Sequence, residues 1–119
     1  MACEQFDVWY YIVYLHRDAD REGASHISAA RIWCQGYCRG RIENFEITFW
    51  QDMSDAPENL SAITPERLAG SLHVAAAEYP WYIDLLRNEK PVRARIFTEP
   101  ALNTLCTLDE RVGEGEPAP

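Results

Sequence analysis

Lysine is almost absent from this 119-residue chain, which has Lys90 alone against ten arginines. Acidic residues outnumber basic ones by 19 to 11, so the formal net charge is −8 at pH 7. A surface of this sign disfavours the phosphate backbone of nucleic acids, which proteins bind through clustered Lys and Arg. Direct nucleic-acid binding is therefore not expected, whereas a basic protein partner would fit the charge.

Long hydrophobic runs are also missing. The longest, residues 8–15, is far shorter than a membrane span of about 20 residues. The first five residues carry no basic side chain, unlike the start of a secretory signal. We therefore expect a cytoplasmic protein with no membrane contact. In that compartment its four cysteines stay reduced: Cys3, Cys34, Cys38 and Cys106.

Recognisable catalytic and metal-binding motifs are missing too, including phosphate-binding loops, nucleophile elbows and His-Glu-x-x-His helices. Cys34 and Cys38 lack the second ligand pair that zinc requires. If residues 35–37 form a hairpin turn, the two thiols face each other and could be oxidised; otherwise they are two reduced thiols. Residues 18–23 begin like a calcium loop, but Ala29 stands where a bidentate Glu is needed. No catalytic residue, metal or cofactor is predicted.

The composition is that of a folded globular domain, with 47% hydrophobic and 25% charged residues. The length fits one domain, which we place at residues 1–112. Residues 113–119 are acidic and contain Gly and Pro, which predicts a disordered tail.

Strands are predicted where β-branched and aromatic residues concentrate or alternate with polar ones. Residues 6–16 are apolar on both faces and read as a central strand. Residues 41–50 show the clearest alternation, and residues 26–35 fit either a strand or a helix, of which the strand is preferred. Residues 92–97 and 102–108 complete the set.

Helix signals follow Thr64, an N-cap residue succeeded by Pro65 and Glu66. They predict a helix to Tyr79, with His73 beside its buried stripe, and a second short helix over residues 81–88. The resulting order is β-β-β-α-α-β-β. It predicts an α+β fold in which one or two helices pack on one face of a mostly antiparallel sheet of four to five strands.

The sheet face opposite the helices is the candidate site. If Tyr10, Ile12, Phe45, Ile47, Val92 and Ile96 point toward the helices, the other face is rich in Trp, Tyr and Arg, the composition of an interface core. A further segment of the same chain could equally cover this face. The residues predicted to bind a partner are Trp9, Tyr11, Arg31, Trp33, Trp50, Arg93 and Arg95.

The leading functional hypothesis is a small acidic, non-enzymatic interaction module, of adaptor or inhibitor type. Its partner would be a basic nucleic-acid-handling protein, another protein, or a second copy in a homodimer. The alternative is a small-molecule binding protein or enzyme. Its pocket would lie between sheet and helices, lined by histidines and by Tyr10, Tyr14, Tyr79 and Tyr82.

Overall fold

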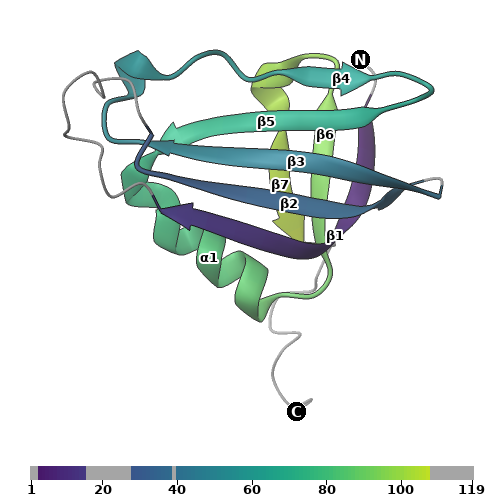
Figure 1. The fold of residues 1–119 in the computed structure, drawn as a ribbon, viewed down its shortest axis with the longest axis horizontal. Coiled ribbons are helices and arrows are strands. Elements are labelled where there is room, and N and C mark those ends of the chain that lie inside the picture. The colour runs from purple at the N-terminus through teal and green to yellow at the C-terminus, as the bar shows by residue number, and fades with distance from the viewer. Residues whose placement is uncertain (1–2, 16–27, 39, 108–119) are drawn as a thin grey trace, which may run out of the picture.

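The computed structural model describes residues 3–15, 28–38 and 40–107, which form one seven-stranded sheet and one α-helix (Figure 1). The strand order is β4-β5-β3-β2-β1-β6-β7, and neighbouring strands are antiparallel except for the parallel pair β3–β5. The strands are β1 (Cys3–Leu15), β2 (Ala30–Cys38), β3 (Arg41–Trp50), β4 (Ser61–Ile63), β5 (Leu68–Ala75), β6 (Val92–Phe97) and β7 (Thr104–Thr107). The helix is α1 (Tyr79–Asn88), and single 3-10 turns occur at η1 (Met53–Asp55), η2 (Ala76–Glu78) and η3 (Pro100–Leu102).

Strand β1 belongs to two layers of the fold. Its first half, residues 3–8, pairs with β6, and residues 7–15 pair with β2. Behind β2 and β3, strands β6 and β7 cross at a steep angle (Figure 1). As a result β6 packs against β5, far from it in the strand order: a Cβ added to Gly70 would lie 2.9 Å from Ile96.

The core lies between these two layers. Alternate residues of β2 and β3 point into it, as the period of a strand requires. The fully buried apolar side chains are Ile32, Cys34, Phe45, Ile47, Phe49, Ala94 and Ile96. At one end the helix closes this core, where the rings of Tyr79 and Tyr82 meet Phe49 edge-on at centroid distances of 5.1 and 5.6 Å.

Gly36 lies where β2 passes the bend in β1. A Cβ at this position would stand 2.0 Å from the carbonyl oxygen of Asp7 and 2.7 Å from the ring of Phe6. Only a residue without a side chain allows so close an approach. The close crossing of β1 and β2 therefore depends on this glycine.

Asn103 ties the two layers together at the opposite side of the core. Its buried Oδ1 accepts hydrogen bonds from the backbone N–H of Phe97 at 2.9 Å and the hydroxyl of Ser61 at 3.1 Å. Its Nδ2 donates to the carbonyls of Leu60 and Ser71 at 3.0 and 3.1 Å. One amide thus joins the turn between β6 and β7 to β4 and β5.

The predicted α+β architecture with four to five strands and a β-β-β-α-α-β-β order is wrong. The described residues are mostly sheet, with seven strands in a mixed sheet and a single α-helix. The error arose at Thr64, whose hydroxyl does accept hydrogen bonds from the N–H groups of Glu66 and Arg67, at 3.3 and 3.0 Å. The same capping chemistry operates in turns, and here it makes the turn between β4 and β5.

The predicted helix from Thr64 to Tyr79 is therefore replaced by β5 over half of its length. Leu68–Ala75 is an inner strand between β3 and β4, so its neighbours supply backbone partners that local propensity cannot reveal. The second predicted helix is confirmed as α1, with Pro80 in its first turn.

The strand assignments for residues 41–50 and 92–97 are confirmed as β3 and β6, and residues 102–108 contain β7. The ambiguous segment 26–35 is described from Ser28, and it is a strand from Ala30 onward. The turn of the β2–β3 hairpin lies between Cys38 and Arg41, where Gly40 has φ 78°. The possible calcium loop at residues 18–23 and the tail at 113–119 lie outside the described residues.

Candidate interaction surface on the open sheet face

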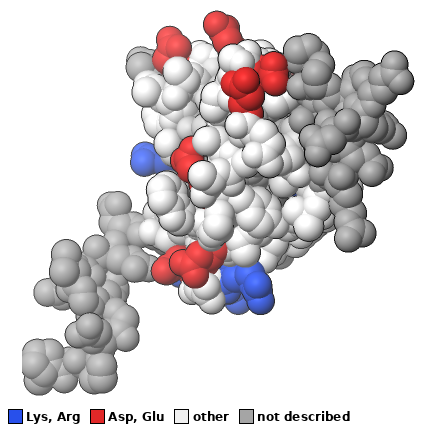
Figure 2. Space-filling model, turned by 90° about the vertical axis from the view of Figure 1, so that its left-hand side faces the viewer, with Lys and Arg blue, Asp and Glu red and all other residues white. Residues whose placement is uncertain are grey.

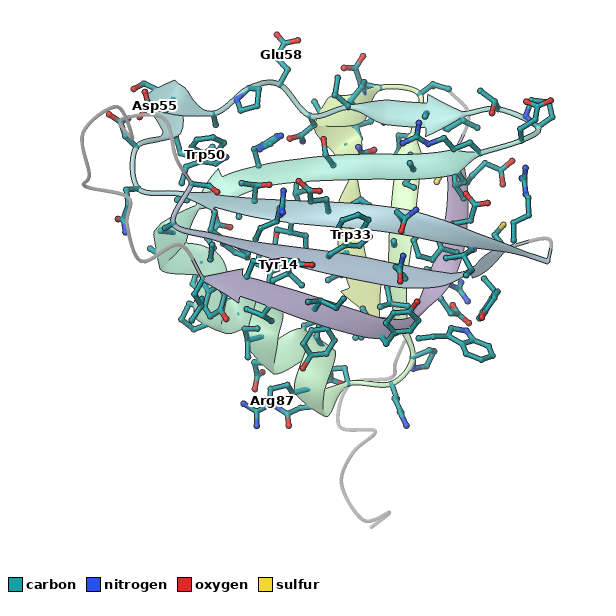
Figure 3. The ribbon with its side chains drawn as sticks, in the orientation of Figure 1. Tyr14, Trp33, Trp50, Asp55, Glu58 and Arg87 are labelled. Atoms are coloured by element: carbon teal, nitrogen blue, oxygen red, sulfur yellow. The ribbon has the colours of Figure 1, made fainter. Side chains whose placement is uncertain are left out.

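One face of β1, β2, β3 and β5 is covered by β6, β7 and α1, and no other element among the described residues covers the opposite face. Figure 3 shows Tyr14, Trp33 and Trp50 on this near side, with α1 and β6 behind the sheet. We call it the open face. The side chains that β2 and β3 direct toward it alternate with the buried core residues.

The side chains of β1 that follow Trp9 face opposite to the expected direction. The pairing of β1 with β2 shifts by one residue between Val8 and Tyr10, so Trp9 forms a bulge. An inserted residue reverses the alternation that follows it. Tyr11 therefore pairs with buried Cys34 and packs against the core, whereas Ile12 pairs with Trp33 and is exposed.

The seven residues predicted to bind a partner do not share one surface. Arg31, Trp33 and Trp50 lie on the open face, in outward register positions of β2 and β3. Trp9 is 69% exposed at the bulge, edge-on to Tyr37 with ring centroids 5.1 Å apart. Tyr11 packs against the core.

Arg93 and Arg95 lie on β6, in the other layer. The guanidinium of Arg93 bonds Asp7 at 3.0 Å, and that of Arg95 lies 6.0 Å from the ring centroid of Phe97. Their separation from Trp33 follows from the bend in β1, which turns the outward side of β6 away from the open face.

Sequence reasoning missed three residues of the open face: Tyr10, Ile12 and Tyr14, which we call the aromatic strip. They are 47%, 45% and 38% exposed. Arg31 borders the strip, with its guanidinium carbon 5.1 Å from the ring centroid of Tyr14. The strip could have been predicted only if the bulge at Trp9 had been recognised. The sequence around Trp9 contains neither Gly nor Pro, so nothing in it indicates a bulge.

The other half of the open face is hollowed into a groove of about 660 Å³. We define the groove by the residues that line it: Trp33, Asn44, Glu46, Pro57, Leu60, Ser61, Ala62, Arg67, Ala69, Gly70, Ser71 and His73. One wall comes from β2 and β3. The other comes from the segment leading into β4, with Leu60 70% exposed.

Hydrogen bonds between side chains orient the polar groups of the groove. Asn44 Oδ1 accepts from the indole N–H of Trp33 at 2.8 Å and from Gln35 Nε2 at 2.7 Å. Because two N–H donors bind the same atom of this amide, that atom is the oxygen. The other atom, Nδ2, can then donate hydrogen bonds into the groove. Glu46 Oε1 accepts from the hydroxyl of Thr48 at 3.4 Å and lies 3.8 Å from Arg31.

His73 lines the groove from β5 and is not a helix residue. Its Nδ1 accepts a hydrogen bond from the indole N–H of Trp50 at 3.0 Å. Desolvation lowers the pKa of His73, against an opposing attraction from Glu46. At neutral pH the ring is therefore uncharged, with its proton on Nε2.

The thiols at positions 34 and 38 do not face each other. Both lie on β2, four residues apart, so about 13 Å of strand separates their Cα atoms. A disulfide needs a separation of about 4.4–6.8 Å. Cys34 is buried, and desolvation raises its pKa to about 12.

The four tyrosines of the alternative pocket also lie apart. Tyr10 and Tyr14 are on the open face, while Tyr79 and Tyr82 contact Phe49 on the covered face. Burial, with a contribution from Glu78, raises the pKa of Tyr82. Within residues 3–15, 28–38 and 40–107, no cluster of three or more His, Cys, Asp or Glu side chains is placed to hold a metal.

Acidic side chains gather in one region of the face that Figure 2 shows. In the view of Figure 2 they concentrate toward the top, and Figure 3 places Asp55 and Glu58 at the upper edge, away from Tyr14 and Trp33.

No helix in the described part of the chain is both long and apolar enough to cross a membrane. The chain matches no known family model, no curated protein and no solved structure.

Proposed function

We propose that this protein is a non-enzymatic interaction module that binds another polypeptide through the aromatic strip on its open face. The observation that carries the proposal is the exposure of Tyr10, Ile12 and Tyr14 side by side on β1. An exposed row of large apolar side chains is costly in water and is typical of interfaces.

The partner that we propose for the strip is a second copy of this chain. With a net charge of −8, copies repel one another over most of their surface. The strip itself is uncharged. Arg31 borders it and lies 3.8 Å from Glu46, and Glu89 and Lys90, also of opposite sign, line a pocket together with Tyr10. Two open faces related by a twofold axis could therefore meet without juxtaposing like charges.

Light scattering coupled to size-exclusion chromatography, over a range of concentrations, tests this proposal. We expect wild-type protein to reach about twice the chain mass of 13.7 kDa. A charge placed on the strip by Ile12→Lys should return the mass to that of one chain, because the interface would have to bury an unpaired ammonium group.

The matched control is Ile42→Lys. Ile42 is an exposed isoleucine (52%, against 45% for Ile12) on β3, near the hairpin turn and away from the strip. This variant should associate like the wild type. A single-chain mass for the wild type at all concentrations would refute self-association. Binding to another protein would then survive only if a captured partner is lost with Ile12→Lys and retained with Ile42→Lys.

A further inference from the structure

The groove has the shape of a binding site for a flat ring. Its floor carries the small side chains of Ala69 and Ser71 on β5, between the indole of Trp33 and the side chain of Leu60. The indole of Trp33 forms one wall of the groove. Because Ala69 and Ser71 are small, their side chains do not shield this ring. Aromatic rings bind the apolar faces of other rings by stacking.

Hydrogen-bonding groups of both kinds line the same groove and are held in place by neighbours. Among the described residues, Asn44 Nδ2 has no acceptor, because its Oδ1 holds the bonds from Trp33 and Gln35. The Nε2–H of His73 also has no acceptor there, since Trp50 occupies Nδ1. Glu46 Oε2 is an acceptor without a donor in this part of the chain, because the bond from Thr48 is to Oε1.

The charges of the lining cancel. The groove contains one carboxylate, on Glu46, and one guanidinium, on Arg67, while His73 is neutral at pH 7. In a chain of net charge −8 this neutral lining selects neither an anion nor a cation. The ligand it fits has hydroxyl groups, because a hydroxyl both donates and accepts.

We propose that the groove binds a neutral saccharide, with one sugar ring stacked on Trp33 and its hydroxyls bonded to Asn44, Glu46 and His73. A pyranose has an apolar C–H face and a rim of hydroxyls, matching the aromatic wall and the oriented polar groups. The groove is open, so a ring within a longer glycan can enter it. The residues that line this site come from β2, β3, β5 and the segment that leads into β4, and none of them belongs to the aromatic strip.

The test is an NMR titration of the ¹⁵N-labelled protein with cellobiose, maltose, lactose and chitobiose, observing the indole N–H groups of the tryptophans. We expect at least one of these sugars to shift the Trp33 signal saturably, with a dissociation constant of about 1 mM or tighter. Trp33→Ala, followed through the backbone amides of β5, should weaken binding at least 10-fold.

Two further variants separate binding from folding. Asn44→Asp keeps an oxygen acceptor for Trp33 and Gln35 but removes the Nδ2 donor, so it should weaken binding about 10-fold with an unchanged melting temperature. Trp9→Ala removes an exposed indole outside the groove and should bind like the wild type.

Three results would overturn the saccharide site. One is the absence of any saturable shift up to about 50 mM of each sugar. Another is undiminished binding by Asn44→Asp and Trp33→Ala. The third is tighter binding of a short polylysine or polyglutamate peptide than of any sugar at the same indole, which would assign the groove to a charged polypeptide.

Discussion

Both faces of the central sheet carry large apolar side chains, but the surroundings of these side chains differ. On the covered face, Phe45, Ile47 and Phe49 are completely buried beneath β6, β7 and α1. On the open face, Tyr10, Ile12 and Tyr14 remain exposed. The difference shows that alternation along a strand separates two faces without telling which of them the rest of the chain covers.

The largest expected effect is that of a substitution at the bend in β1, which brings β6 and β7 over the covered face. Gly36→Ala places a methyl group 2.0 Å from the carbonyl oxygen of Asp7, so either β1 moves away or the fold is lost. We expect a loss of at least about 3 kcal/mol of unfolding free energy, measured by urea denaturation.

Gly40→Ala is the control for Gly36→Ala. Gly40 has a positive φ of 78° but nothing within 4 Å of an added Cβ, so this variant should cost only about 1 kcal/mol. Equal losses for the two alanine variants would show that the close crossing of β1 and β2 does not require glycine at position 36.

The attachment of the covering layer can be weakened at Asn103. Asn103→Leu preserves approximate size but leaves the N–H of Phe97 and the carbonyls of Leu60 and Ser71 without their partner. Because these groups are part-buried, we expect a loss of about 2–4 kcal/mol in urea or thermal unfolding.

The control for Asn103→Leu is Asn88→Ala, which removes only the exposed hydrogen bond to Asp84 and should change stability by less than about 0.5 kcal/mol. A loss for Asn103→Leu no greater than that of Asn88→Ala would mean that the covering layer is held by apolar packing alone.

The smallest expected effect lies on the open face, at His73. Burial lowers its pKa below the ordinary value of 6.5, so the unfolded chain binds a proton more readily than the native one. The stabilising contribution is present above pH 6.5 and is lost as the pH falls through the lower native pKa. Between pH 7 and pH 5 the wild type should therefore lose slightly more stability than His73→Gln. A steeper loss for His73→Gln would reverse the sign of this linkage.

Much of the covered face could be predicted from the sequence. The alternation of Phe45, Ile47 and Phe49 indicated both strand β3 and its buried side correctly. The open face could not be predicted as well, because the bulge at Trp9 exchanged Tyr11 for Ile12 at the surface. The bend in β1 also separated Arg93 and Arg95 from Trp33, although all were assigned to one face.

The sequence by itself determined the acidic charge, the strands with clear alternation and the helix that begins near Pro80. These features depend on composition and on neighbours a few positions apart. The tertiary structure alone decided that Leu68–Ala75 is a strand, that β1 serves two layers, and that a groove forms beside Trp33. Each of these depends on backbone hydrogen bonds and close contacts between distant segments, such as Glu43 with the N–H of Leu68 and Asn103 with Ser71. Contacts of this range leave no periodic signal in the chain.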